Sequence, residues 1–445
     1  MQKITCLLYA IIILLFFNLT FSSCKEEPPV VPPPPPPDMK DTITITIVEE
    51  MHRSIVVNVK TTTNFPNSFI ELCRTFNNTD TLVAEYPITV TDTTILDENN
   101  GQDLKINTEY TYYAVRRDSI GEKKDTSNIV TAKTLNAAEF NYTWQELSFG
   151  SLEYGPNVLY DVWGSDENNV WAVGGFYDDN NRNYGALHYD GSGWTPDSTV
   201  GGRAIHGFAW NDIWVVGGGV FHFNGVEWKQ IDSYTSGGQS IPLDTVLFNN
   251  KPYASVWGTS SSNIYFGNSH GRIIHWDGNK ASVVYTYESD VSVNDLDGYS
   301  ADFIIGVGIG FTPPLLAIYY NGVSWNKLPI ENDPSLRSVA IVSRNHIYFA
   351  GSGVYEMKGN SFSRTFTSGY FIYDIDYNRQ NGITVAAGPF GGVYINNGIE
   401  WRNYQGQITT DDNDFVGIFL INDTIFCVGR NDNQAKIIIG KNLET

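Results

Sequence analysis

The stretch that decides the fold is DVWGSDENNVWAVGGFYDDNNRNYGALHYDGSGW, residues Asp161–Trp194. Its apolar runs predict four short strands, the first three at Asp161–Gly164, Val170–Gly174 and Ala186–Tyr189. The dipeptide Asp190-Gly191 predicts a type I′ hairpin before the fourth strand, because that turn needs positive φ and Asp-Gly adopts it readily. The unit is therefore predicted to form one four-stranded antiparallel sheet.

The same unit recurs six more times toward the C-terminus. In each copy a Val or Ile opens the second strand, at positions 170, 213, 264, 304, 347, 383 and 425, so the intervals range from 36 to 51 residues. Four strands per forty-odd residues are typical of a β-propeller blade. The spacing predicts a seven-bladed β-propeller over residues 140–445.

The seventh copy ends in KIIIGKNLET and lacks the aromatic fourth strand of the other copies. A matching strand lies upstream, because Tyr142–Leu147 has the pattern of Val226–Ile231 and Val323–Leu328. An open ring would expose strand edges. We therefore predict that the strand around Trp144 becomes the outer strand of the last blade.

The blades resemble the degenerate propellers of bacterial surface and secreted proteins, whose repeats have the form W-G-x-x-x-x-[DN]-V-W-A-V-G followed by H-x-[DN]-G-x-x-W. They are also similar to the repeats of photosystem-II assembly-factor-like propellers. The resemblance covers about 300 residues and implies architecture alone, since propellers include hydrolases, lyases, lectins and protein-binding platforms.

Composition narrows the possible partners. The 445-residue chain has a formal net charge of −21, with 17% charged and 14% aromatic residues. Such a surface repels nucleic acid and anionic lipid headgroups, and the aromatic content argues against disorder. Of four cysteines, Cys73 and Cys427 fall in separate predicted domains, so we expect buried, reduced thiols and no disulfide framework.

The N-terminal region predicts export and lipidation. A basic start and a fourteen-residue apolar run make residues 1–23 a signal peptide. Phe21–Cys24 resembles a bacterial lipobox, and the adjoining Lys25–Glu27 resembles the surface-export signal of Bacteroidota lipoproteins. The resemblance implies acylation of Cys24 and an outer-membrane protein that faces the exterior, held by its lipid alone. Residues 24–39 add a proline-rich, extended spacer.

Residues 40–136 alternate apolar and polar residues, as strands do. The segment Leu104–Ala114 resembles the sixth strand of a fibronectin type III domain, in which Leu104 and Tyr110 would form the tyrosine corner. The second strand lacks the family's usual tryptophan, with Val57 or Val59 in its place, so an immunoglobulin-like relative is the alternative. The predicted fold class is thus all-β, a fibronectin type III-like sandwich followed by the propeller.

Two kinds of residue raise the question of catalysis or metal binding. Counting back seven and nine residues from each second-strand opener places five aspartates on the channel wall, Asp161 among them. A hydrolase or lyase could use the other four: Asp295, Asp297, Asp374 and Asp376. We favour a structural role, as acceptors of hydrogen bonds from neighbouring blade turns. His188, His222 and His275 occupy equivalent slots that would fan out around the ring, so we predict no metal and no cofactor.

Breaks in the repeat are the better candidates for binding. Long connections on a rigid scaffold commonly carry recognition, and tyrosine with Asp, Asn and Arg suits a glycan or a protein. The acidic pairs Asp178-Asp179 and Asp411-Asp412 lack EF-hand spacing for Ca²⁺. The ligand-binding candidates are Tyr177, Asp178, Asp179, Arg182, Tyr184, Tyr234 and Phe311.

The preferred hypothesis is a monomeric, non-catalytic surface lipoprotein whose propeller binds an extracellular glycan or surface protein. One alternative is a propeller glycoside hydrolase or lyase that uses the channel carboxylates. Another is a structural partner in an outer-membrane assembly. The sequence does not name the ligand.

Overall fold

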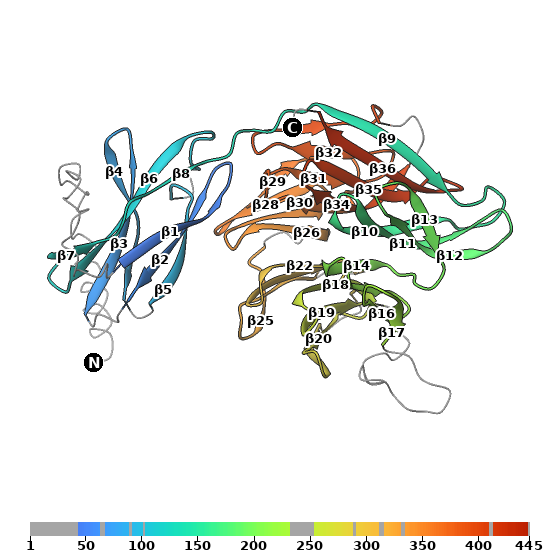
Figure 1. Cartoon of the computed structure of the whole chain (residues 1–445), viewed down its shortest axis with the longest axis horizontal. Helices are drawn as coiled ribbons and strands as arrows, with labels where there is room; N and C mark the ends of the chain where they lie inside the picture. The colour runs from blue at the N-terminus through green and yellow to red at the C-terminus, as the bar shows by residue number, and fades with distance from the viewer. Residues whose placement is uncertain are drawn as a thin grey trace, which may run out of the picture. The chain divides into compact units, whose positions relative to one another are not determined.

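The computed structural model describes residues 43–62, 67–88, 91–100, 103–231, 253–287, 291–310, 316–330, 334–408 and 413–443. The predictions for the signal peptide, Cys24 and the proline-rich spacer lie outside these residues. The chain divides into two compact units, one ending at Asn136 and the other beginning at Ala137. The regular elements of both are strands (Figure 1), and no helix in the described residues could span a membrane.

The first unit contains two antiparallel sheets around a common core. The core combines Ile45 and Val57 of one sheet with Leu72 and Tyr112 of the other, all almost fully buried. The smaller sheet consists, in order, of β1 (Ile43–Glu50), β2 (Ile55–Thr61) and β5 (Asp92–Asp97). The larger consists of β4 (Thr79–Pro87), β3 (Ser68–Phe76), β6 (Glu109–Asp118) and β7 (Lys123–Thr126), with β8 (Val130–Lys133) also paired to β6.

A buried polar cluster joins the two sheets of this sandwich. Arg74 of β3 makes two 2.7 Å hydrogen bonds to the carboxylate of Asp97 at the end of β5, and the Tyr112 hydroxyl donates to the same group at 2.8 Å. Nearby, the Tyr110 hydroxyl accepts a hydrogen bond of 2.9 Å from the backbone of Lys105. That contact has the geometry expected of a tyrosine corner.

The second unit contains seven four-stranded antiparallel sheets, here numbered one to seven along the chain (Figure 1). Sheets one to three are β10 (Val158–Asp166), β11 (Asn169–Tyr177), β12 (Asn183–Tyr189), β13 (Trp194–Asp197); β14 (Ala204–Ala209), β15 (Asp212–Val216), β16 (Val220–Phe223), β17 (Trp228–Gln230); and β18 (Tyr253–Ser260), β19 (Asn263–Asn268), β20 (Arg272–Trp276), β21 (Ala281–Thr286). Sheets four and five are β22 (Asp295–Ser300), β23 (Phe303–Gly308), β24 (Leu316–Tyr320), β25 (Trp325–Lys327); and β26 (Leu336–Ser343), β27 (His346–Gly351), β28 (Val354–Lys358), β29 (Ser361–Phe366). Sheets six and seven are β30 (Asp374–Tyr377), β31 (Thr384–Ala387), β32 (Val393–Asn396), β33 (Trp401–Asn403); and β34 (Asp414–Ile421), β35 (Thr424–Arg430), β36 (Ala435–Asn442), β9 (Tyr142–Phe149).

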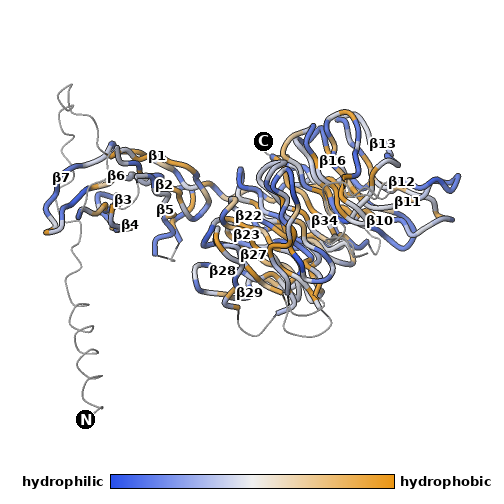
Figure 2. Tube along the Cα trace, turned by 90° about the horizontal axis from the view of Figure 1, so that it is seen from below, coloured by the Kyte–Doolittle hydropathy of each residue, from blue (hydrophilic) through white to orange (hydrophobic). Residues whose placement is uncertain are grey.

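The first strand of each sheet contacts the first strand of the next, and β34 of sheet seven contacts β10 of sheet one. Apolar side chains fill the interfaces between sheets, and Figure 2 shows apolar segments along the strands with polar segments at many turns. Trp171 of sheet one, for example, packs against Phe223 and Trp228 of sheet two at centroid distances of 5.5 and 5.3 Å. Aromatic residues of the repeat therefore fill the core between sheets at this interface.

The strand β9 completes sheet seven, as predicted. It pairs antiparallel with β36, and Trp144 lies opposite Gly440, where a Cβ would come within 2.4 Å of the indole ring. Tyr142 and Trp144 pack into the core shared with sheet six, whereas Leu147 and Phe149 pack into the core shared with sheet one. One strand therefore joins sheets six and seven, near the end of the chain, to sheet one, which comes first in this unit.

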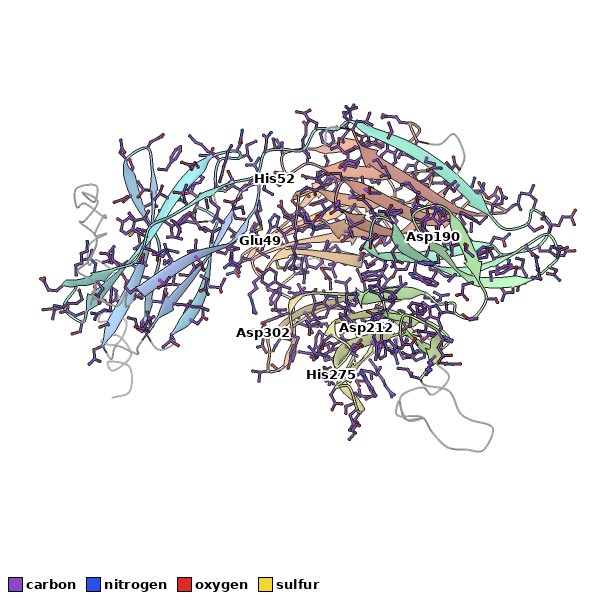
Figure 3. All side chains as sticks on the ribbon, viewed as in Figure 1. Glu49, His52, Asp190, Asp212, His275 and Asp302 are labelled. Atoms are coloured by element: carbon purple, nitrogen blue, oxygen red, sulfur yellow. The ribbon has the colours of Figure 1, made fainter. Side chains whose placement is uncertain are left out.

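The predicted turn type is wrong. In the hairpin after β12, only Gly191 has positive φ, and it is the first of the two central residues, as in a type II′ turn. Asp190 (labelled in Figure 3) lies before the turn, where its Oδ1 accepts hydrogen bonds from the backbone of Ser192 and Gly193 at 2.9 and 3.1 Å. These side-chain bonds hold Asp190 outside the left-handed region, so the glycine alone supplies the positive φ.

A cross-link between β9 and β36 tests this pairing. The partners Thr143 and Lys441 face each other across the strands, so Thr143→Cys with Lys441→Cys should form a disulfide on oxidation. Because the bond would close nearly the whole unit into a loop, we expect the unfolding free energy to rise by about 2–4 kcal/mol, measured as a higher urea midpoint. The out-of-register pair Ser148→Cys with Lys441→Cys should form no disulfide, and equal cross-linking of both pairs would contradict the register.

Candidate binding site at one end of the ring

Carboxylates on the first strands connect neighbouring sheets around the centre of the ring. Asp161 on β10 accepts hydrogen bonds from the backbone of Val162, in its own strand, and of Ile205, in sheet two, at 2.8 and 2.9 Å. A first strand has no further strand on its inner side, so its inner N–H groups lack a ladder partner. The side chain supplies that partner.

The four acids proposed for catalysis make the same contact. Each accepts a backbone N–H from the first strand of the following sheet: Asp295 from Val339 at 2.9 Å, Asp297 from Ile341 at 2.7 Å, Asp374 from Ile418 at 2.7 Å and Asp376 from Leu420 at 2.9 Å. The donors lie in the neighbouring strand itself, whereas the sequence analysis predicts donors in neighbouring turns. The reason is that the inner edge holds the N–H groups without strand partners.

Other side chains fill this register where no acid is present. Trp163 packs over Gly207 and Trp257 over Gly298, since a Cβ on either glycine would come within 2.5 or 2.3 Å of the ring. His206 forms a 3.1 Å contact with the backbone carbonyl of Gly258. Sheets one to four and sheet six thus fill this register with acids, aromatic rings or a histidine.

Burial changes the protonation of the channel acids. It raises the pKa of Asp161 to about 8, of Asp297 to about 7 and of Asp376 to about 6, because the enclosed wall disfavours the charged form. A protonated carboxyl still accepts a backbone N–H. The network therefore persists while its charge changes.

Ser338 connects two of these acids. Its Oγ lies 2.8 Å from Asp295 and 2.6 Å from Asp374, and it accepts a hydrogen bond from the backbone of Ile375 at 3.2 Å. One hydroxyl proton cannot serve both carboxylates. Burial, followed by the charge of Asp295, raises the pKa of Asp374 well above its usual value, so we assign a proton to Asp374, which donates it to Ser338.

A cavity of about 160 Å³ opens where the first strands begin, at the end of the ring that carries the connections between sheets. Two arginines line it. The guanidinium of Arg203 lies over the ring of Tyr160 at 5.1 Å, and that of Arg337 lies over Tyr373 at 4.9 Å. Each pair is formed across the boundary between two sheets.

Neither arginine is neutralised in the described part of the chain. No described carboxylate lies within 4.0 Å of either guanidinium group, although ion pairs occur elsewhere, as between Arg182 and Asp178. Burial lowers the pKa of Arg337, the charges of Asp374 and Asp295 raise it, and the positive charge of Arg203 lowers it to a smaller extent. Two cations close enough to repel each other, neither of them with a described carboxylate within 4.0 Å, make this cavity a candidate anion site.

An exposed aromatic pair lies at the same end of the ring. Tyr370, in the connection from β29 to β30, and Phe390, in the turn from β31 to β32, are 46% and 47% exposed and have ring centroids 4.9 Å apart. Phe390 has φ of +57°, a conformation that costs about 1–2 kcal/mol for a residue with a Cβ. Strain of this kind at a non-glycine residue is common at functional sites.

The sequence pattern alone did not identify these residues. Counting back seven and nine residues from the second-strand openers gives the channel acids, but counting back ten gives the cavity residues Tyr160, Arg203, Arg337 and Tyr373. A second signal was the phenylalanine inside the glycine-rich stretch GPFGG, residues 388–392. An aromatic residue in a glycine-rich turn is unusual unless it contacts a ligand or a partner.

The predicted loop candidates form a self-contained hairpin at the same end. Asp178 accepts the backbone N–H of Arg182 at 2.9 Å and forms a 2.6 Å ion pair with its side chain. Tyr177 ends β11, Tyr184 stacks on Phe176 at 5.5 Å, and Asp179 is exposed. The candidates Tyr234 and Phe311, and the pair Asp411-Asp412, lie outside the described residues.

The repeated histidines occupy equivalent structural positions. His188 stacks on Trp171 at 4.2 Å and contacts the Asn169 side chain through Nε2 at 2.7 Å. His275 (labelled in Figure 3) repeats both contacts with Tyr265 and Asn263. His222 does so with Trp214 and Asp212, the latter also labelled in Figure 3. Within the described ranges, no group of three or more His, Cys, Asp or Glu side chains is arranged to hold a metal ion.

Comparisons with known proteins identify the fold of the second unit. No family model and no curated protein matches the chain. A solved structure described as YCF48 bound to D1 peptide aligns with a TM-score of 0.50 and 15% identity, covering 68% of this chain and 98% of its own. The WD40 β-propeller domain of Doa1 aligns with a TM-score of 0.48 and 14% identity, covering 67% and 97%. The all-β chain carries a β-propeller.

The raised pKa values predict how stability depends on pH. A carboxyl whose pKa is higher in the folded state than in the unfolded state binds its proton more tightly when folded. The stability that it contributes is complete at low pH and is lost as pH rises through the folded pKa. We therefore expect the unfolding free energy to fall from pH 5 to pH 8, by up to about 1.4 kcal/mol per pH unit for each such group.

Urea midpoints measured across that range check the expectation. Asp161→Asn should reduce the slope, because it removes a group that titrates near pH 8. Asp190→Asn is the matched control, since hydrogen bonds from Ser192 and Gly193 lower the pKa of Asp190 to about 2, outside the range. A slope that is unchanged by Asp161→Asn would show that Asp161 is ionised throughout.

Proposed function

We propose that the protein is a non-catalytic surface lipoprotein whose propeller binds an extracellular partner at the end of the ring that carries the cavity. The observation that carries the proposal is the cavity itself, with Arg203 and Arg337 lacking a carboxylate partner among the described residues and an exposed aromatic pair at the same end. The channel acids already accept hydrogen bonds from the inner strands, so the two arginines and the exposed aromatic pair are not needed to hold the sheets together. Binding of a partner would give these groups a role.

A protein partner is favoured over a glycan. The solved propeller of similar fold is described as bound to a peptide, which agrees with a protein partner in general terms. In addition, the faces of Tyr160 and Tyr373 are covered by guanidinium groups. Each ring therefore has one face less for stacking on a sugar ring, the common mode of aromatic sugar recognition.

Catalysis is the second candidate, and one observation favours it. Asp295 and Asp374 line the cavity, and the hydroxyl of Ser338 is hydrogen-bonded to both carboxyl groups. Carboxyls with a perturbed pKa are frequent in active sites. Against it, each of these acids accepts a backbone N–H from the next sheet. Asp297 and Asp376 do so as well, and each also accepts one from its own strand. Such bonds restrict the approach of a carboxyl to substrate, which general acid catalysis requires.

The first unit completes the proposed architecture. We infer that it is a fibronectin type III-like spacer, supported by two sheets around one core and by the Tyr110 contact. Acylated Cys24 and the proline-rich segment would connect this spacer to the outer membrane. An anchor with two spacers is useful when the binding end must work at a distance from the membrane.

We expect binding without turnover for the chain that lacks the proposed signal peptide, residues 1–23. On a panel of immobilised extracellular proteins and polysaccharides, the protein should be retained by at least one, and it should release no reducing ends from any polysaccharide. Retention should weaken when Tyr370→Ala and Phe390→Ala are combined, because the pair is exposed on the proposed binding end. Reducing ends that disappear in Asp297→Asn would instead establish the hydrolase.

Lipid attachment is tested by metabolic labelling with palmitate. The full chain should incorporate label and sediment with membranes, and Cys24→Ala should abolish both, because Cys24 is the proposed acylated residue. Cys6→Ala is the matched control and should leave labelling unchanged. Labelling that survives Cys24→Ala would refute the anchor.

A further inference from the structure

We propose that the cavity binds a carboxylate carried by a polypeptide partner, and that Tyr370 and Phe390 hold an apolar side chain beside it. This inference rests on the proposed function, because it names the chemistry by which the propeller would recognise its partner. The carboxylate can belong to an acidic side chain or to a chain terminus. Both present the same planar group.

The two arginines provide the geometry. A guanidinium that lies over an aromatic face keeps its N–H donors in its own plane, so Arg203 over Tyr160 and Arg337 over Tyr373 have donors free for the cavity. A planar fork of donors matches a carboxylate in a bidentate arrangement. The stacked rings hold each fork in place before the ligand arrives, which reduces the entropy lost on binding.

The acids of the wall do not neutralise this site. Asp161, Asp295 and Asp374 line the cavity, but they direct oxygens to the backbone N–H groups of Ile205, Val339 and Ile418. Burial also raises the pKa of all three carboxyls, which reduces the negative charge near the arginines. The remaining charge therefore favours an anion.

The size of the cavity limits the ligand to one group. At about 160 Å³ it is smaller than the roughly 300–1,000 Å³ typical of small-molecule sites. Ser269, Ser292 and Asn294 give the rest of the lining hydrogen-bonding capacity. A side-chain or terminal carboxylate fits such a space, while the rest of the partner lies on the surface.

The exposed aromatic pair gives the second contact. The Tyr370 and Phe390 rings are inclined at 53°, so they form an angled apolar surface that suits a side chain better than a flat sugar ring. Tyr370 is three residues before Tyr373, whose ring carries Arg337. The connection from β29 to β30 thus supplies parts of both contacts.

Small probes test the proposal on the full chain in detergent. N-acetylphenylalanine carries both a carboxylate and an apolar ring, and N-acetylphenylalaninamide lacks only the charge. Titration calorimetry should show saturable binding of the acid, at least tenfold weaker binding of the amide, and weaker binding of glucuronate and inorganic phosphate. Binding of the amide equal to the acid, or tighter binding of glucuronate or phosphate, would overturn the proposal.

Variants locate the site. Arg203→Gln with Arg337→Gln should weaken binding of N-acetylphenylalanine at least tenfold, and Tyr370→Ala with Phe390→Ala should weaken it without changing the response to acetate. Arg344→Gln is the matched control, because Arg344 also lies over an aromatic ring, that of Phe303, but at the opposite end of the first strands. The affinity of the Arg344→Gln variant for N-acetylphenylalanine should stay within twofold of that of the unmodified chain. Urea midpoints for each variant separate lost binding from lost folding.

Failure of the carboxylate site can be distinguished from failure of the proposed function. A partner that is retained equally by the double arginine variant would leave surface binding intact and overturn the carboxylate site. Turnover of a polysaccharide would overturn the non-catalytic role, while the calorimetric titration would still decide whether the cavity binds a carboxylate.

Discussion

The inner edge of each propeller sheet is the constraint on which the rest of the second unit depends. Seven first strands face the centre, and none has a further strand to pair with its inner N–H groups. An unsatisfied buried N–H costs about 1–3 kcal/mol. Carboxylates such as Asp161 and Asp297 remove that cost by accepting N–H groups from the neighbouring sheet, and in doing so they hold sheet two against sheet one and sheet five against sheet four.

This solution has an electrostatic consequence. Acids that are placed for backbone contacts become enclosed, and enclosure raises their pKa, so the centre of the ring carries less negative charge than its sequence implies. The Asp374–Ser338–Asp295 contact is an extreme case, in which one hydroxyl between two carboxyls requires an additional proton. A wall made of partly neutral acids offsets less of the positive charge of Arg203 and Arg337 than a wall of ionised acids would.

Periodicity in the sequence was enough to predict the architecture of the ring. The interval between second-strand openers indicated the seven sheets, and the missing aromatic strand at the C-terminus predicted the pairing of β9 with β36. These features are local patterns that recur at intervals of 36 to 51 residues. The turn type was wrong because the Asp190 side chain competes with the backbone for hydrogen bonds, and the choice between two turns that both use glycine depends on that competition.

The site was harder to predict for a physical reason. The channel acids occur in a register that alternates along one strand, whereas the cavity combines single residues from different sheets, such as Arg203 and Tyr373. Each is ordinary in its own repeat, and only the ring brings them together. Phe390 is similar, since its left-handed backbone and its exposed contact with Tyr370 depend on two turns separated by about twenty residues.

The overall charge and the local charge of the protein act in opposite directions. A net charge of −21 repels an acidic partner at long range, whereas two arginines attract its carboxylate only within the cavity, at distances shorter than the Debye length of about 8 Å at physiological salt. Salt screens the long-range repulsion more than the contact inside the cavity. An acidic partner would therefore associate faster as salt rises, and a carboxylate on a neutral or basic partner would reach the cavity without this barrier, so the charge distribution selects partners by what surrounds the carboxylate as well as by the carboxylate itself.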